Sequence, residues 1–70
     1  MPHEFHIILE RDDDWFIGYC PEVPGAHSQG QTKEECRLNV LDAVELILQY
    51  RFEQAMRGVP QEAMVEPLDS

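Results

Sequence analysis

Basic residues are scarce in this sequence: 5 Lys and Arg stand against 14 Asp and Glu in 70 residues, so the formal net charge is -9. Phosphate backbones are bound by clustered Lys and Arg, and this shortage therefore argues against nucleic-acid binding by the chain itself. The acidic excess favours either a basic protein partner or a charge that keeps the chain in solution. Composition does not choose between the two.

Cysteines and long apolar runs are also few. Cys20 and Cys36 are too few for a disulfide framework, and their spacing matches no zinc or thioredoxin-like motif, so we expect both to be reduced packing residues. No stretch reaches the ~18 apolar residues of a membrane span. Residues 1–4 lack the positive charge and apolar run of a signal peptide. A cytoplasmic protein is expected.

The short length leaves room for one domain, covering residues 1–70. Folding at this size buries only roughly 60% of the unfolded surface, which suits a single layer of sheet and helix. The hydrophobic fraction of 43% is enough for a packed interior and argues against disorder. We find no internal repeats.

The first half of the chain is typical of a β-hairpin. Phe5–Glu10 and Trp15–Cys20 are rich in aromatic and β-branched residues, and Arg11–Asp14 separates them. The three aspartates favour a turn because their carboxylates accept backbone N–H groups. A calcium loop would need alternating ligands and a distant Glu, which are absent.

The next segment is expected to turn and form a third strand. Pro21–Gly25 must leave the hairpin, because its prolines lack ladder donors and Gly25 can supply the positive φ of a type II turn. Ala26–Gln29 has room for a short strand, which Gly30 ends.

The clearest local signal is a helix start at Thr32. Thr32 and Glu35 fit a capping box, and the helix is predicted over residues 33–57. Gly58 is expected to close it in the left-handed conformation, Pro60 to prevent its resumption, and Arg57 to pair with Glu53.

Ala63–Glu66 alternates and predicts a fourth, terminal strand. The order of elements predicts an α+β fold, a two-layer β-β-β-α-β domain with one long helix on one face of a small sheet. The last strand would lie parallel to a neighbour after a right-handed crossover.

The faces of the sheet follow from the hairpin register. If Arg11 pairs with Asp14, the pairs Leu9 with Phe16, Ile7 with Gly18 and Phe5 with Cys20 face the helix, and Gly18 permits its close approach. The other face carries Glu10 and the residues that we predict to form an oligomer or partner interface: His6, Ile8, Trp15, Ile17 and Tyr19. A register shift of one residue, or coverage by residues 21–30, is the alternative.

The predicted helix has a wide apolar arc. Cys36, Val40, Ala43, Ile47 and Tyr50 form one stripe. Further apolar residues extend it sideways: Leu41, Val44, Leu48 and Phe52, with Leu38 and Leu46 further round. This arc is wider than one small sheet needs, and a homo-oligomer is the economical interpretation.

No catalytic, cofactor or metal site is predicted. His3 and His6 project to opposite faces of a strand and make a poor chelate, and His27 has no evident partner. A thiolate near a helix start can be activated, but Cys36 falls on the core stripe. Ser28, Thr32 and Ser70 form no triad that the sequence supports. We expect no enzyme. An enzyme with a pocket between subunits would need His27, His6 or Cys36 to meet a carboxylate across an interface.

The segment from Trp15 to Ala43 resembles the HicB-like antitoxin family. The family's order of motifs is present: Trp15-Phe16, Pro21-Glu22-Val23-Pro24-Gly25, Gly30, Thr32, Glu34-Glu35, Asn39 and Ala43. Each motif is short, but their order and spacing together are fairly specific.

This resemblance implies a β-β-β-α-β domain like a degraded ribonuclease H fold without catalytic carboxylates. It also implies an oligomeric antitoxin that covers a small basic mRNA-ribonuclease toxin. Pro21, Pro24, Gly25, Gly30, Thr32 and Glu35 would be structural residues of the turn and helix cap. Ala26 and Gln31 depart from the usual residues without threatening the fold.

A second departure concerns DNA. Many members carry a C-terminal DNA-binding domain, and only four residues follow Glu66 here, so operator binding is not expected. Solitary domains of this type also exist without an assigned toxin. The alternative is therefore an oligomeric interaction or scaffold domain of the same fold.

Overall fold

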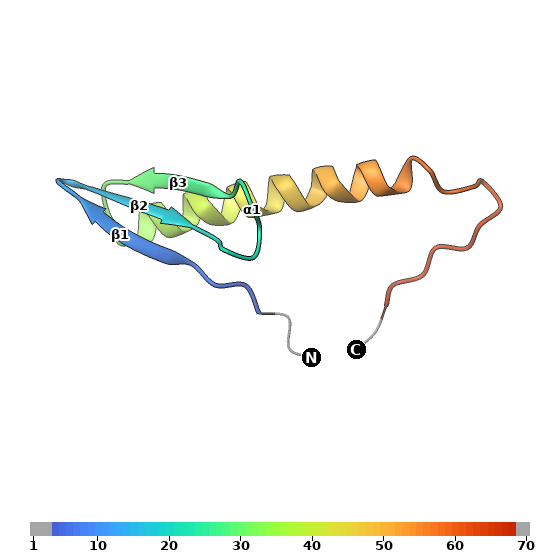
Figure 1. The fold of residues 1–70 in the computed structure, drawn as a ribbon, viewed down its shortest axis with the longest axis horizontal. Coiled ribbons are helices and arrows are strands. Elements are labelled where there is room, and N and C mark those ends of the chain that lie inside the picture. The colour runs from blue at the N-terminus through green and yellow to red at the C-terminus, as the bar shows by residue number, and fades with distance from the viewer. Residues whose placement is uncertain (1–3, 69–70) are drawn as a thin grey trace.

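The computed structural model describes residues 4–68 and has three strands followed by one helix (Figure 1). The strands are β1 (Ile8–Asp12), β2 (Trp15–Tyr19) and β3 (His27–Gly30), and the helix is α1 (Lys33–Met56). The strands form an antiparallel sheet in the order β1-β2-β3, and α1 lies across one face of it. This arrangement confirms the small α+β class.

The hairpin register differs from the predicted one by two residues. Asp12 pairs with Trp15, so the turn consists of Asp13 and Asp14, and β1 does not include Phe5, His6 or Ile7. Asp13 takes a φ of 54°, a left-handed conformation that Asp tolerates better than most residues. Three consecutive aspartates offer nearly equivalent turns, which is why the sequence did not locate this one. A shift of two leaves every side chain on its predicted face.

The turn after β2 is as predicted. Ala26 N–H donates to the Val23 carbonyl at 3.0 Å, with Pro24 and Gly25 between them, and Gly25 has a φ of 92°. These are the features of a type II turn, in which the third residue needs a positive φ. The turn directs Val23 into the core, where it is 1% exposed. β3 begins one residue later than predicted, at His27.

The helix begins with the predicted cap. Thr32 Oγ1 accepts the Glu35 N–H at 3.0 Å. Glu35 Oε1 reaches back to accept the Gln31 N–H at 3.1 Å, one residue before the position that a capping box would use. Both side chains therefore satisfy backbone donors at the start of α1.

The helix ends differently from the prediction. Gly58 does not take the left-handed conformation: among residues 4–68, Gly25 is the glycine with positive φ. Instead Arg57 stays right-handed and donates its N–H to Gln54 at 3.3 Å, and Val59 donates to Met56 at 3.1 Å. These tight turns satisfy the last carbonyls without a left-handed residue. No ion pair joins Arg57 to Glu53 within the described residues.

The predicted fourth strand at residues 63–66 is wrong. Within residues 4–68 the sheet has three strands, and the segment after α1 is an extended tail without strand pairing (Figure 1). A helix of 24 residues is about 36 Å long, whereas a five-residue strand spans about 17 Å, so the chain leaves the helix well beyond the sheet. The parallel crossover is consequently not formed.

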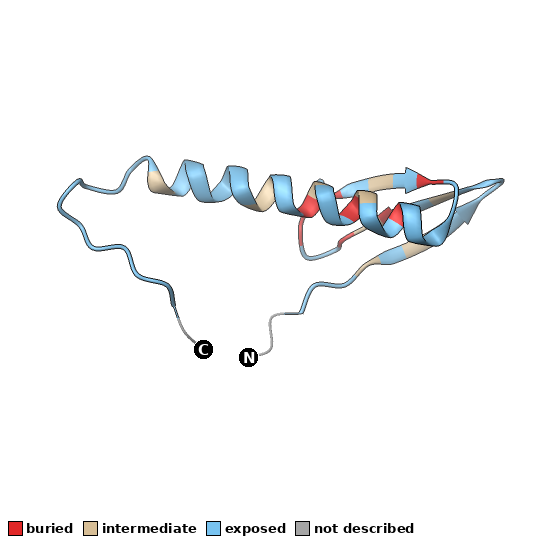
Figure 2. Cartoon of the chain, turned by 180° about the vertical axis from the view of Figure 1, so that it is seen from behind, coloured by how far each residue is buried: buried red, intermediate tan, exposed pale blue. Residues whose placement is uncertain are grey.

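The core is small and lies between the sheet and the first half of α1 (Figure 2). Gly18 permits this packing as predicted, because a Cβ there would lie 2.9 Å from Cys36 Sγ and 3.0 Å from Val40 Cγ2. The prediction that Phe5 faces the helix from within the strand is wrong: Phe5 precedes β1 and is 56% exposed. The buried residues are Cys20, Val23, Ala26, Cys36, Val40 and Val44.

Candidate protein-binding surface

One face of the sheet carries large apolar side chains that nothing in the described chain covers. Ile8, Trp15 and Ile17 are 38%, 41% and 39% exposed, and Tyr19 is half-buried. Ile8 pairs with Tyr19, so both lie on the same face, next to Ile17. The opposite face turns Gly18 toward α1. The apolar and uncovered character of the predicted interface face is therefore present, while its use as an interface stays a prediction.

Neither alternative to an uncovered face is realised. The register moved by an even number of residues, so the apolar set was not transferred to the helix side. The loop after β2 packs Val23 against the core beneath α1 rather than over Trp15 and Ile17.

The turn end of this face is acidic. Glu10 pairs with Ile17 and Asp12 with Trp15, which places both carboxylates on the apolar face. Asp13 and Asp14 form the adjoining turn. The surface, which we call the hairpin face, thus combines an apolar centre with negative charge at one end. Its members are Ile8, Glu10, Asp12, Trp15, Ile17 and Tyr19.

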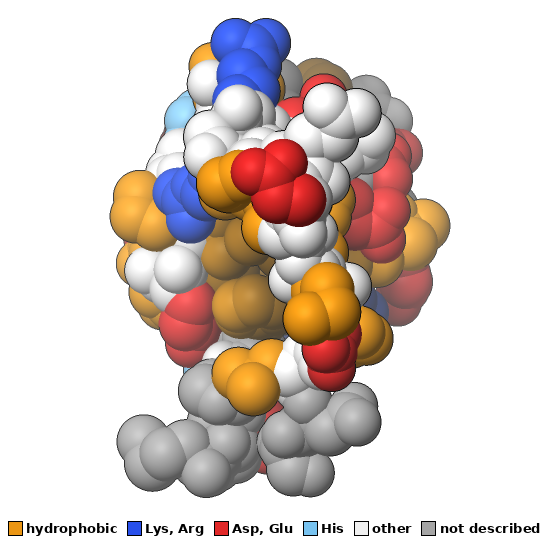
Figure 3. All heavy atoms as spheres, turned by 90° about the vertical axis from the view of Figure 1, so that its right-hand side faces the viewer, with side chains coloured by type: hydrophobic (Ala, Val, Ile, Leu, Met, Phe, Trp, Pro, Cys, Tyr) orange, Lys and Arg blue, Asp and Glu red, His pale blue; other side chains and the backbone are white. Residues whose placement is uncertain are grey.

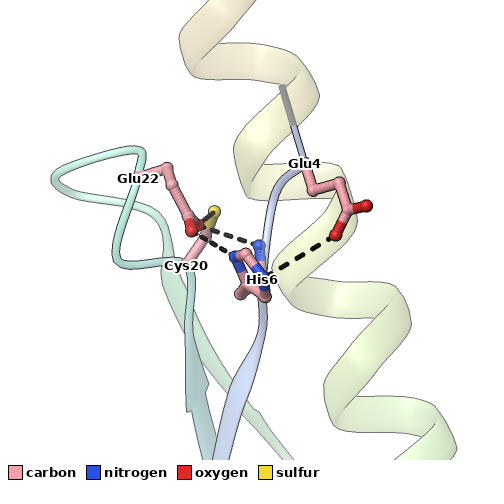
Figure 4. Close-up of polar contacts among 4 residues, drawn as sticks. All are labelled: Glu4, His6, Cys20 and Glu22. Atoms are coloured by element: carbon pink, nitrogen blue, oxygen red, sulfur yellow. Dashed lines mark hydrogen bonds and ion pairs between the residues drawn. The ribbon is translucent and has the colours of Figure 1, made fainter. Parts of the chain in front are cut away.

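His6 does not take its predicted place in the hairpin. It precedes β1, and Tyr19 pairs with Ile8 instead. His6 contacts Glu22 (Figure 4): its backbone N–H donates to Glu22 Oε1 at 2.8 Å, and its Nδ1 contacts Oε2. The His6 Nε2 lies 3.9 Å from a Glu4 carboxylate oxygen, and Cys20 Sγ is a weak donor to Glu22. We call residues 4–7 the N-terminal arm.

The contact with His6 changes the acidity of Glu22. The backbone N–H of His6, followed by its ring, lowers the pKa of the Glu22 carboxyl to about 2. The sequence did not reveal this pairing, because sixteen residues separate the partners and neither belongs to a recognisable motif. It ties the N-terminal arm to the loop that follows β2.

A second surface feature that the sequence did not reveal is a groove between the N-terminal arm and α1. Its volume is about 240 Å³, and its lining is mostly apolar. Arg37 contributes a cationic group to it. The lining residues are Phe5, His6, Ile7, Cys20, Arg37, Val40, Leu41 and Val44.

The remaining chemically reactive candidates have structural surroundings. Cys20 and Cys36 are buried free thiols, as predicted. Burial, assisted by the negative charge of Glu35, raises the pKa of the Cys36 thiol, which disfavours a nucleophilic thiolate. Thr32 Oγ1 is engaged in the helix cap. His3 and Ser70 lie outside the described residues.

The predicted structural residues have clear local roles. Pro24 and Gly25 form the turn, and Thr32 and Glu35 cap α1. A Cβ at Gly30 would lie 2.6 Å from the backbone nitrogen of Cys36, so this position needs glycine. Pro21 follows the buried Cys20 at the start of the loop.

Two wider properties of residues 4–68 bear on the kind of site present. No group of three or more His, Cys, Asp or Glu side chains is arranged to hold a metal ion there. In the same part of the chain, no helix is both long enough and apolar enough to cross a membrane.

Comparison with known proteins places the chain in a family. It is 39% identical over 71 aligned positions to UPF0150 protein ssl0738 of Synechocystis sp.. This alignment covers 97% of this chain and 96% of that protein. UPF0150 protein ssr1765 of the same organism is 30% identical over 94% of this chain and 85% of its own length. A UPF0150 protein of Thermotoga maritima is 38% identical over 64% of this chain and 63% of its own.

No family model and no solved structure matches the chain. The two Synechocystis relatives cover nearly all of it at 30% identity or more. The chain belongs to the UPF0150 family.

Proposed function

We propose that the chain is a non-enzymatic, HicB-like antitoxin domain that acts in the cytoplasm by binding and neutralising a small basic mRNA-ribonuclease toxin. The observation that carries this proposal is the hairpin face, where exposed Trp15 and Ile17 adjoin Glu10 and Asp12. The largest apolar patch on a monomeric protein is often a functional one.

The chemistry of the hairpin face suits a basic partner. Cations that hold RNA phosphates on a ribonuclease would meet the carboxylates at the turn, which speeds the encounter between the proteins. Trp15 and Ile17 would supply the desolvated contact that resists dissociation, as aromatic anchors do in other interfaces. Occupation of the cationic surface would exclude RNA by competition.

Membership of the UPF0150 family is consistent with the resemblance to HicB-like antitoxins. The motifs behind that resemblance also have a shared physical basis. Pro24 and Gly25 make the type II turn, Gly30 admits the helix, and Thr32 caps it. Together they hold β2 and β3 against α1 and leave the hairpin face outward.

The proposal is tested by co-expressing the chain with the small basic protein encoded beside it. Growth should be rescued from the toxin, and the two proteins should copurify as a complex. Ile17→Lys should abolish rescue, because it places a cation in the apolar centre of the hairpin face. Lys33 lies on the opposite side of the sheet at the helix start, so Lys33→Ala is the matched control and should rescue growth. Absence of both rescue and complex formation with the unaltered chain would contradict an antitoxin role.

A scaffold domain without a toxin is the second candidate. The exposed apolar residues on the far half of α1, such as Tyr50 and Phe52, favour it because they suit self-association. The two functions differ in a simple genomic observation: a scaffold does not require a neighbouring reading frame for a small basic protein.

A further inference from the structure

The second half of α1 and the tail that follows it are apolar but uncovered. The helix continues past the core, and Phe52 on this part is 61% exposed. In the tail, Met64 and Leu68 are 88% and 99% exposed. Seen from this end of the molecule, hydrophobic side chains occupy much of the surface between acidic groups (Figure 3).

The amount of exposed surface is too large for a self-contained domain. A folded monomer of 8.1 kDa exposes roughly 4,500 Å², whereas this chain exposes 6115 Å². The excess is roughly 1,600 Å², about twice the area that each partner gives to a standard interface. The radius of gyration agrees: it is 15.7 Å, against about 11 Å for a compact chain of this length.

The groove and the exposed part of α1 belong to one continuous surface. Leu41 and Val44 line the groove, and Leu48 and Phe52 follow them at intervals of four residues along the same side of the helix. Val44 is buried in the core of its own chain, so we call Leu48 and Phe52, which follow the groove along α1, the helix stripe. The helix stripe ends beyond the sheet.

We propose that a second copy of this chain covers the helix stripe, with the two helices antiparallel and residues 62–68 of each chain lying in the groove of the other. A twofold axis midway between Leu48 and Phe52 would place Leu48 of one copy beside Phe52 of the other. The end of each helix then lies near residue 43 of its partner. Each tail therefore starts next to the groove that it fills.

The tail matches the groove in chemistry. Met64, Val65 and Leu68 provide apolar groups for a groove lined mainly by apolar side chains. Glu62 and Glu66 flank Met64 and Val65, and Arg37 in the groove offers the opposite charge. Within residues 4–68, Arg37 has no ion-pair partner of its own chain.

A tail is less able to reach the groove of its own chain. The helix end at Arg57 lies about 24 Å beyond Leu41 along the helix axis. Residues 58–64 would span that distance only if fully extended. Two turns shorten the segment, because Val59 donates to Met56 and Ala63 donates to Pro60. The groove of a second copy lies next to the helix end, so the tail reaches it without being fully extended.

Sedimentation of the full chain at several concentrations tests the proposed dimer, which does not require a toxin. The unaltered chain should sediment as a dimer, and Phe52→Asp should raise the dimer dissociation constant at least about tenfold, as loss of an interface anchor does. Leu46→Asp is the control, because Leu46 is also exposed but lies about 160° round the helix from Leu48. A monomeric unaltered chain would overturn the proposal, as would equal effects of the two substitutions.

Charge reversal tests the tail contact separately. Arg37→Glu and Glu66→Arg should each weaken the dimer, and the double variant should regain at least half of the lost affinity. Circular dichroism checks that each variant keeps its helix. Failure of the double variant to recover, with the helix intact, would contradict the assignment of the tail to the groove.

Cross-linking shows whose tail occupies the groove. A mixture of Leu41→Cys chains and tagged Met64→Cys chains should form a mixed disulfide dimer in higher yield than either variant alone. The unaltered chain is the control for its buried Cys20 and Cys36. If a chain carrying both substitutions instead forms the bond only within itself, the exchange between copies is overturned. These results are independent of toxin rescue.

Discussion

Glu22 accepts the backbone N–H of His6 at 2.8 Å and also contacts Nδ1 of the same residue. The contact holds the N-terminal arm beside the loop that follows β2. His6 lines the groove, and Glu22 does not line it but contacts His6. The position of the arm, and with it one wall of the groove, depends on an ionised carboxylate.

The first prediction concerns the pH dependence of this contact. The pKa of Glu22 is lowered from 4.5 to about 2 in the folded chain, so the unfolded chain binds the proton more readily. The stabilisation should be complete above pH 4.5 and should disappear as the pH falls toward 2. Thermal unfolding of the unaltered chain and of Glu22→Gln at pH 6, 4 and 2.5 measures it. The difference between them should shrink with falling pH.

Asp42→Asn is the control for that series. Asp42 is exposed on α1, lies outside the groove and the tail, and has no hydrogen bond or ion pair of its side chain within residues 4–68. Its substitution should leave the unfolding temperature of the chain nearly unchanged at each pH. A Glu22→Gln effect that stays constant between pH 6 and 2.5 would show that the carboxylate does not act through its charge.

Local signals predicted the parts of the fold that are stabilised locally. The Thr32 cap and the turn at Gly25 each depend on residues within four positions, so the sequence sufficed to predict them. The hairpin turn was misplaced because Asp12, Asp13 and Asp14 are chemically alike, and only the pairing along both strands selects one turn.

Features that depend on distant contacts were beyond local reasoning. Residues 63–66 alternate like a strand, but a strand needs a neighbour, and the length of α1 carries this segment past the sheet. The His6–Glu22 contact joins segments brought together by the fold itself. Ile8, Trp15, Ile17 and Tyr19 lie on their predicted face because an even register error preserves the two faces, whereas His6 was wrongly placed in the strand.

The second prediction concerns the close approach of α1 to the sheet. Gly18→Ala should lower the free energy of unfolding by about 1–3 kcal/mol, because the added Cβ would lie 2.9 Å from both Cys36 Sγ and Leu9 Cδ2. Urea unfolding measures the loss. Gly58→Ala is the matched control, since nothing lies within 4 Å of a Cβ there and its φ is not positive. Equal stability of the two variants would contradict tight packing at Gly18.

The third prediction concerns the helix cap. Thr32→Ala should lower the free energy of unfolding by about 1 kcal/mol, because the N–H of Glu35 would lose its side-chain acceptor. Thr32→Ser keeps the hydroxyl and should restore most of the stability. Urea unfolding followed at the helical circular dichroism signal measures both. A Ser variant as unstable as the Ala variant would indicate that the Thr methyl group, rather than its hydroxyl, is what matters.

The fourth prediction separates the two proposed surfaces. Ile17→Lys changes the hairpin face, whereas Phe52→Asp changes the helix stripe, and both side chains are exposed enough for the monomer fold to survive. Ile17→Lys should abolish toxin rescue while the chain still sediments as a dimer. Phe52→Asp should dissociate the dimer and leave the hairpin face able to bind toxin in a direct titration. If Ile17→Lys dissociates the dimer instead, the hairpin face is the surface of self-association, and the basic partner must bind elsewhere.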